Sequence, residues 1–168
     1  TVTATFDIQQ YTLTTSVVGQ GNITSSPVGI SCGTGTSNDC TQAYNYNTVV
    51  TLTATPVSGY SFSGWTGCDS SAGNSCTVTM TAAKNVQATF SVVTYTLTLN
   101  KAGSGTGNVT SSPSVINCGT GCATQSASFA SGTNVQLTAA VNPGNTFAGW
   151  SGSGCSGTGI CNVLMNSS

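Results

Sequence analysis

The sequence has almost no charged side chains, and this scarcity excludes several classes of partner. Its 168 residues contain two lysines and three aspartates, with no arginine, glutamate or histidine, and the net charge is -1. Ordinary soluble domains carry a charge on about 25% of their residues. Without a basic patch the chain cannot neutralise phosphate groups, so we expect neither nucleic acid nor an anionic membrane surface as a partner.

The missing histidine and glutamate also argue against catalysis. A serine or cysteine nucleophile needs a neighbouring base, and carboxylate catalysis needs two acids close together. The three acids, Asp7, Asp39 and Asp69, are separated along the chain and suit turns, where a carboxylate accepts backbone hydrogen bonds. We therefore expect no enzymatic activity and no cofactor.

Long apolar runs and metal-ligand patterns are missing as well. No stretch reaches the roughly 18 apolar residues that indicate a membrane helix, so membrane insertion is not expected. The eight cysteines have neither histidines nor basic neighbours beside them, which argues against a zinc site. Disulfides fit these neutral, glycine-rich loops better, and they indicate an oxidising location that is extracellular or at the cell surface.

What the sequence does contain is one pattern that occurs twice. Self-similarity at a fixed period is typical of tandem-repeat proteins. We predict a first repeat at residues 11–94 and a second at residues 95–168. The segments 11–14, 21–27, 30–35, 50–54, 62–65 and 76–80 return with few changes at 95–98, 107–113, 116–121, 135–139, 147–150 and 161–165.

The segment that closes the first repeat recurs out of order. It reads Val-Gln-Ala-Thr-Phe at residues 86–90, and no such segment follows in the second repeat. A matching Val-Thr-Ala-Thr-Phe lies near the start of the chain instead. Residues 1–10 are therefore interpreted as the closing strand of a preceding repeat or of a neighbouring subunit, with Val2, Ala4 and Phe6 forming the inter-repeat strand.

Three arrangements remain open for residues 1–10. In the first, the chain is a window from a longer array, and another copy follows residue 168. In the second, residues 1–10 complete the last repeat of a neighbouring chain by donor-strand pairing, where main-chain hydrogen bonds supply the affinity. Both make a head-to-tail contact, which propagates into a filament when it does not close. In the third, residues 1–10 pack on this chain's own second repeat.

Alternating apolar and polar residues predict an all-β fold. β-branched residues are abundant and no helical stripe is visible. A turn at residues 19–22 predicts that the strands on either side of it form a hairpin. We expect about five or six short strands in each repeat, as a β-grasp-like fold or a small sandwich with no significant helix. In the first repeat, strands fit residues 11–18, 23–26, 48–56, 60–65, 77–80 and 85–92.

Each repeat holds four cysteines, which allow three pairings. Local pairing is favoured because the spacing within each neighbouring pair differs between the repeats, as expected for closed loops with free tips. Repeats this small bury little apolar surface and depend on such staples. Each closed loop should add roughly 2–3 kcal/mol to the free energy of unfolding. The predicted pairs are Cys32–Cys40, Cys68–Cys76, Cys118–Cys122 and Cys155–Cys161.

Trp65 and Trp150 occupy the same position of a Phe-x-Gly-Trp motif in the two repeats. If exposed, they would stack on sugar rings. If buried, they would anchor the core with their large apolar area. The strand-like spacing of the motif favours core anchors, and a surface glycan remains the alternative partner.

Taken together, the repeated motifs resemble a known family. They include Tyr-Thr-Leu-Thr, Gly-Asn-[Ile/Val]-Thr-Ser-Ser-Pro, Ile-x-Cys-Gly-Thr-Gly, Phe-x-Gly-Trp, Cys-x-Val-x-Met and Val-x-Ala-Thr-Phe. This combination is similar to the divergent internalin-type B-repeats, which occur in tandem on large bacterial surface and secreted proteins. The resemblance covers nearly the whole chain. It implies a small β-rich fold, an extracellular setting, a stalk, adhesin or fibre role, and no catalytic residues.

The sequence therefore predicts a structural repeat of an extracellular bacterial fibre, filament or surface stalk. Copies of the chain would be joined head-to-tail through the N-terminal strand. The alternative is a carbohydrate- or surface-binding adhesin module of a large secreted protein. The two predictions differ in whether Trp65 and Trp150 are core residues or lie exposed beside a polar groove.

Overall fold

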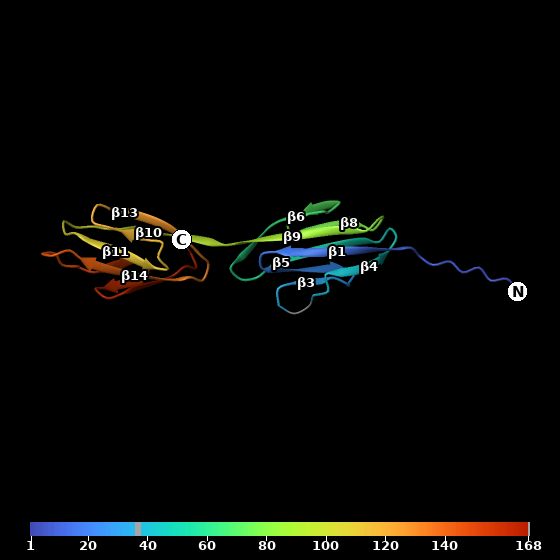
Figure 1. Ribbon diagram of the computed structural model, residues 1–168, viewed down its shortest axis with the longest axis horizontal. Coiled ribbons are helices and arrows are strands. Elements are labelled where there is room, and N and C mark those ends of the chain that lie inside the picture. Colours follow the sequence, from blue (N-terminus) through green and yellow to red (C-terminus); the bar gives the residue numbers. More distant parts are fainter. Residues whose placement is uncertain (36–37, 168) are drawn as a thin grey trace. The chain divides into compact units, whose positions relative to one another are not determined.

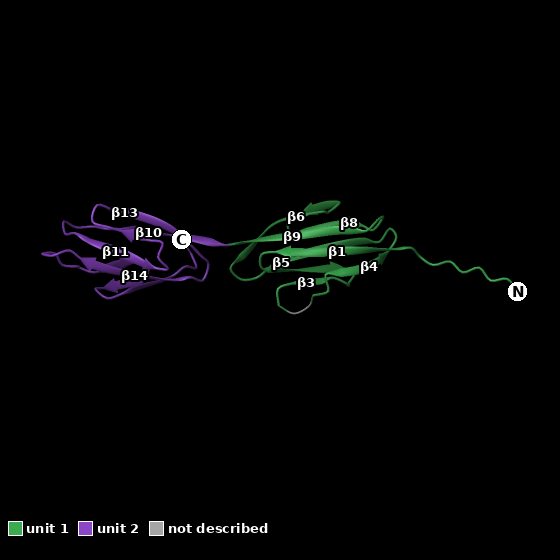
Figure 2. Cartoon of the chain, in the orientation of Figure 1, with its two compact units in different colours: residues 1–92 green, residues 93–168 purple. Residues whose placement is uncertain are grey.

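The computed structural model describes residues 1–35 and 38–167, and these residues form only β-strands, turns and connecting segments (Figure 1). The predicted all-β class is confirmed. The chain divides into two compact units, residues 1–92 and residues 93–168 (Figure 2). Ser168, the predicted last residue of the second repeat, lies outside the described residues.

Unit 1 is a sandwich of two sheets with the strand orders β4-β1-β9-β6 and β3-β2-β5-β8-β7. Leu13 of the first sheet and Ile23 and Leu52 of the second are fully buried in one shared apolar cluster. The core therefore lies between the sheets. The strands are β1 (Gln10–Val18), β2 (Gly21–Ser26), β3 (Ser31–Gly33), β4 (Thr41–Asn45), β5 (Val49–Pro56), β6 (Tyr60–Thr66), β7 (Ser70–Ala72), β8 (Ser75–Thr79) and β9 (Lys84–Val92).

Strand β9 holds the first sheet of unit 1 together. It pairs in parallel with β1 and antiparallel with β6, so it provides hydrogen-bond partners for one edge of each of these strands. Successive side chains of a strand point to opposite faces. Accordingly, Val86, Ala88 and Phe90 are at most 3% exposed, while the residues between them are only half-buried.

The predicted hairpin across residues 19–22 is wrong, because the strands on either side of it lie in different sheets. β1 pairs with β4 and β9, whereas β2 pairs with β3 and β5. Leu13 and Ile23 both enter the core, so the chain crosses from one sheet to the other between them. Gly19 makes this crossing with a φ of 84°, and a Cβ there would lie 2.1 Å from the carbonyl oxygen of Phe90.

Unit 2 repeats this plan with fewer paired strands. Its sheets have the orders β10-β13, β12-β11-β14-β17 and β15-β16, and Ile116 and Val135 are fully buried in its core. The described residues of the two units form nine and eight strands, more than the predicted five or six, because short strands also flank the disulfide loops. The strands are β10 (Thr94–Asn100), β11 (Gly107–Ser112), β12 (Asn117–Cys118), β13 (Thr124–Ala130), β14 (Asn134–Val141), β15 (Trp150–Gly152), β16 (Cys155–Gly157) and β17 (Cys161–Leu164).

The disulfides attach the loops to the cores. The structure contains four of them, each between the two neighbouring cysteines of a loop, and the described residues include no free cysteine. One partner of every pair is a buried core residue, at no more than 4% exposure. Each disulfide therefore ties the other end of its loop to a strand of the core. The buried partners are Cys32, Cys76, Cys118 and Cys161.

The repeated Gly-Asn-x-Thr-Ser-Ser-Pro motif forms the same turn in both units. In unit 2, Ser111 Oγ donates to the Pro113 carbonyl oxygen at 2.6 Å and accepts from the Ile116 N–H at 2.9 Å. Ser25 makes the matching bonds in unit 1 at 2.7 Å and 2.9 Å. One hydroxyl thus satisfies both sides of the turn, which explains the serine at this point of each repeat.

Replacing Ser111 with alanine should lower the free energy of unfolding by about 1–3 kcal/mol, because the Ile116 N–H loses its partner in a buried site. Thermal unfolding followed by circular dichroism measures the change. Ser112→Ala, at the exposed neighbouring position, is the matched control and should cost much less. An equal loss in both variants would contradict this role of the Ser111 hydroxyl.

An ion pair joins Asp69 and Lys84 in unit 1. Lys84 Nζ donates to the Asp69 carboxylate, and the Thr79 backbone N–H donates to it at 2.7 Å. The lysine hydrogen bond first, and the Thr79 bond second, hold the pKa of Asp69 below its ordinary value of 3.8. The Asp69 side chain is 44% exposed, so solvent screens the pair and its effect on stability is modest.

The stabilisation from this pair should be fully present above about pH 3.8 and lost as the pH falls through the lowered pKa of folded Asp69. Asp69→Asn should therefore lower Tm slightly at pH 6, and its difference from the wild type should shrink on acidification. Asp7→Asn, in the exposed N-terminal segment, is the control and should leave Tm unchanged. A difference that grows as the pH falls would show that the sign is wrong.

Candidate functional site

Among its described residues, unit 2 has no strand at the position that β9 fills in unit 1. In unit 1, β9 lies between β1 and β6. In unit 2, β10 corresponds to β1 and pairs with β13 alone, while β15 corresponds to the end of β6 and pairs with β16 alone. Each of these two strands therefore keeps one unpaired edge.

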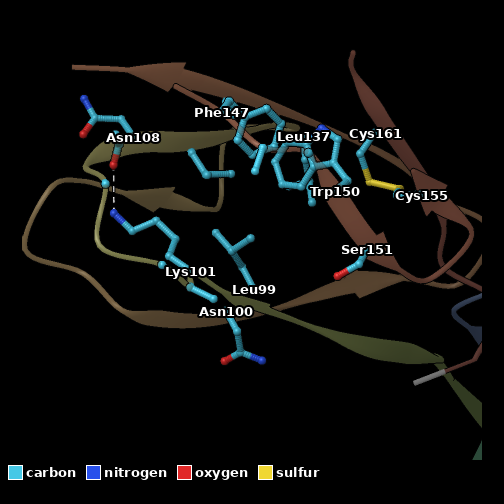
Figure 3. A pocket seen from close by; sticks show the side chains of 18 of the residues that line it. Leu99, Asn100, Lys101, Asn108, Leu137, Phe147, Trp150, Ser151, Cys155 and Cys161 are labelled. Atoms are coloured by element: carbon cyan, nitrogen blue, oxygen red, sulfur yellow. Dashed lines mark hydrogen bonds between the residues drawn. A yellow bond between two sulfur atoms is a disulfide. The ribbon is translucent and has the colours of Figure 1, made fainter. Parts of the chain in front are cut away.

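A cleft of about 620 Å³ lies beside β10 (Figure 3). The loop at residues 101–107 and the segment at residues 146–153 form two of its sides. We call this space the unit 2 cleft. Its apolar walls come mainly from Leu97, Leu99, Leu137, Phe147, Trp150 and Val163.

The walls of the unit 2 cleft are more exposed than the matching core of unit 1. Ala54 and Val78 are 2% and 0% exposed in unit 1. Their counterparts Ala139 and Val163 line the cleft and are only half-buried. The cleft therefore has the character of an incomplete core, with apolar side chains that a further strand would cover.

Two glycines at equivalent positions of the repeats, Gly67 and Gly152, differ in what lies beside them. Gly67 in unit 1 has a φ of 85°, and a Cβ there would lie 2.0 Å from the carbonyl oxygen of Asn85 in β9. Its counterpart Gly152 keeps a φ of 91°, yet a Cβ there would meet nothing within 4 Å. Gly152 thus has the conformation that accommodates a neighbouring strand, beside open space.

The aromatic cluster of unit 2 is one ring short. In unit 1 the ring centroid of Phe62 lies 5.4 Å from that of Trp65 and 5.6 Å from that of Phe90. In unit 2, Phe147 and Trp150 form the same pair at 4.9 Å. The described residues of unit 2 provide no ring in the place of Phe90. The apolar site that Phe90 fills in unit 1 is accordingly open in unit 2.

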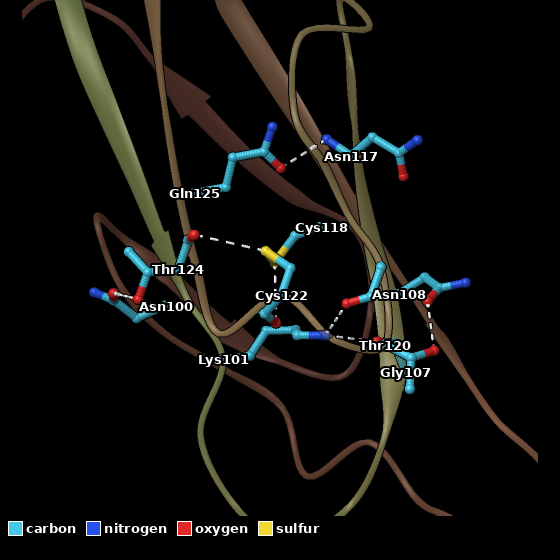
Figure 4. The surroundings of a disulfide bond; sticks show 11 residues. Asn100, Lys101, Gly107, Asn108, Asn117, Cys118, Thr120, Cys122, Thr124 and Gln125 are labelled. Carbon is cyan, nitrogen blue, oxygen red and sulfur yellow. Dashed lines mark hydrogen bonds between the residues drawn. A yellow bond between two sulfur atoms is a disulfide. The ribbon is translucent and has the colours of Figure 1, made fainter.

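Lys101 provides a cationic group at the side of the unit 2 cleft (Figure 3). Its Nζ donates to the carbonyl oxygens of Gly107 at 2.8 Å and Gly119 at 2.6 Å. The bond to Gly119 ties the cleft loop to the loop between Cys118 and Cys122, which has the shortest sequence separation of the four disulfides (Figure 4). Sequence reasoning missed this role, although a lysine at the position of the apolar Val17 in the first repeat was a visible signal.

The residues predicted to form the inter-repeat strand are exposed. Val2 and Phe6 are 100% and 92% exposed, Ala4 is exposed too, and residues 1–9 pair with no strand of the described chain. Just before β1, the Gln9 carbonyl oxygen accepts a hydrogen bond from the Tyr46 N–H at 2.8 Å. The structure thus leaves several apolar side chains of this segment in water, which favours their burial against a partner.

The two tryptophans are half-buried, and each packs against the core of its own unit. Trp150 Nε1 donates to the Gly159 carbonyl oxygen at 2.6 Å. The buried Trp65 Nε1 has no partner within the part of the chain that the structure describes. Trp150 lines the unit 2 cleft, whereas Trp65 packs among the residues of a filled core.

The described residues contain no group of three or more His, Cys, Asp or Glu side chains that could hold a metal ion. Nor does this part of the chain form a helix long and apolar enough to cross a membrane. The unit 2 cleft offers apolar walls and the unpaired edge of β10. The interactions that it supports are side-chain packing and main-chain hydrogen bonding.

A family model described as the divergent InlB B-repeat domain matches the chain twice, at residues 11–94 and at residues 95–167. The resemblance that the repeated motifs indicated is confirmed. No curated protein and no solved structure matches the chain. The two matches together span most of the chain and leave residues 1–10 outside them.

The two matched glycines give a direct test of the open strand position. Gly67→Ala should lower the free energy of unfolding by more than about 3 kcal/mol, because the new Cβ collides with the β9 backbone in a strained conformation. Gly152→Ala should cost only about 1 kcal/mol, the strain of a positive φ. Thermal unfolding of the dilute protein measures both, and similar losses would contradict an open position beside Gly152.

Proposed function

The chain belongs to the divergent InlB B-repeat domain family, and from this premise we propose that it is a structural repeat of an extracellular bacterial fibre or surface stalk. Copies are linked head-to-tail through the N-terminal strand at residues 1–10. The chain acts as a building element and carries no catalytic activity. Its partners in this role are other copies of itself.

The family supports the coarser part of this proposal. Tandem B-repeats are modules of bacterial surface proteins and are a non-catalytic kind of domain. The four disulfides suit an oxidising environment outside the cytoplasm. Only five charged side chains are present, so copies repel one another little when they pack closely.

One observation carries the head-to-tail linkage. Residues 1–9 are exposed and include apolar side chains, and among the described residues of unit 2 no strand fills the position of β9. Because the donor and acceptor surfaces differ, the contact is heterologous. Such a contact adds copies in one direction and yields a filament unless the rotation between copies closes a ring.

The alternative of a carbohydrate-binding adhesin has weaker support. Trp150 is the tryptophan that lines the unit 2 cleft, but its indole N–H already bonds to the Gly159 carbonyl oxygen. Trp65 packs against the filled core of unit 1. Neither arrangement resembles an exposed stacking platform beside a polar groove. The fibre or stalk is therefore the better supported of the two functions.

Electron microscopy of the full chain without reductant tests the proposal. We expect filaments with a uniform axial repeat, and we expect the double variant Val2→Asp with Phe6→Asp to remain as single particles. The matched control is Thr3→Asp with Thr5→Asp, which adds the same charge to the other side of the segment and should disturb assembly much less. Isolated particles for the wild type at all concentrations would contradict the fibre proposal.

A further inference from the structure

We infer that the unit 2 cleft is the acceptor for residues 2–6 of a second copy of the chain, which enter it as the missing counterpart of β9. The inserted strand lies parallel to residues 99–103, which include the last two residues of β10, and antiparallel to residues 147–151. This inference rests on the proposed function, and it specifies which surface receives the N-terminal strand and in which register.

The register follows from the internal repeat. In β9, Val86 stands beside Thr15 of β1, and Ala88 stands beside Val17 of β1 and Trp65 of β6. Transferred to unit 2 by the repeat, Val2 stands beside Leu99, and Ala4 stands between Lys101 and Trp150. A shift by one residue would turn every inward side chain outward, so the apolar pattern allows only registers that differ by two.

Phe6 supplies the ring that unit 2 lacks. In β9 the matching Phe90 is 3% exposed and contacts Phe62 edge-on. Phe147 is the counterpart of Phe62 and lines the unit 2 cleft. Burying the 92% exposed Phe6 there would remove a large apolar side chain from water and complete the aromatic cluster.

The smaller inward residues also fit. Ala88 is fully buried in unit 1, and Ala4 provides the same small side chain beside the bulky Trp150. Gly152 leaves space for the backbone at the start of the donor strand, as Gly67 does for Asn85. Residues 3 and 5 are threonines, which suit the outer, half-buried face of a strand.

The spacing from the donor segment to the next strand is the same as the spacing after β9. In the first repeat, Tyr95, where the following repeat begins, lies nine positions after Val86. Tyr11, where β1 has just begun, likewise lies nine positions after Val2. The junction between copies would thus reproduce the covalent junction between repeats. Every two successive repeats, within a copy or between copies, would then be joined by a connection of the same length.

The first experiment measures peptide binding to the full chain. The acceptor is the Val2→Asp, Phe6→Asp variant, whose own N-terminal strand cannot compete, and it also carries Trp65→Phe so that Trp150 alone emits. The probe is a synthetic peptide of residues 1–10. We expect a saturable blue shift of Trp150 emission, and at least tenfold weaker binding for a peptide with Phe6→Asp.

Two further acceptor variants locate the site. Ala139→Arg places a charged side chain in the unit 2 cleft and should abolish binding of the peptide. Thr138→Arg adds the same charge to the exposed face of β14 and should leave binding intact. Circular dichroism confirms that each variant is folded before it is compared. Equal binding to both variants would overturn the cleft as the acceptor.

The register and the donor are tested separately from assembly. A photo-crosslinking residue at position 4 of the peptide should label the segments around Lys101 and Trp150, and labelling confined to other parts of the chain would overturn the register. Filaments that persist with Ala139→Arg would preserve the fibre proposal and overturn this acceptor. A wild-type monomer with residues 2–6 protected would show that the strand closes its own unit 2, which overturns donation by a second copy.

Discussion

The first sheet of unit 1 depends on one interaction, the insertion of β9 between β1 and β6. In unit 1, β9 makes this insertion and pairs with both neighbours. It also brings Val86, Ala88 and Phe90 into the core, which the other strands of unit 1 alone would leave open. Unit 2 retains the surrounding elements, the aromatic pair and Gly152, and in place of the strand it has the unit 2 cleft.

Other features of the chain stabilise unit 2 and suit it to contact with a second copy. A sandwich of this size has a small core, and each disulfide fixes a loop to a buried cysteine of that core. In unit 2, Lys101 donates one hydrogen bond within the cleft loop, to Gly107, and one to Gly119 of the loop closed by Cys118–Cys122. The low number of charges leaves the surfaces around the cleft nearly neutral, so a second neutral chain can approach without repulsion.

The sequence was sufficient to predict the all-β class, the two repeats and the family, because these follow from the period of two along strands and from motifs that occur twice. It misassigned the partner of β1, since alternation identifies a strand but not the sheet in which Leu13 and Ile23 place it. The short strands beside the disulfides carry too few residues to show a period. The cleft and the contacts of Lys101 depend on distances between segments far apart in the sequence, which no local pattern contains.

The central claim is that the position of β9 in unit 2 is filled by residues 2–6 of another copy. Amide hydrogen exchange of the wild-type chain, measured by mass spectrometry across a range of protein concentrations, tests it most directly. The account predicts that residues 2–6 exchange rapidly in dilute protein and become as protected as residues 86–90 once copies assemble. Rapid exchange of residues 2–6 in the assembled protein, or protection that does not change with concentration, would contradict it.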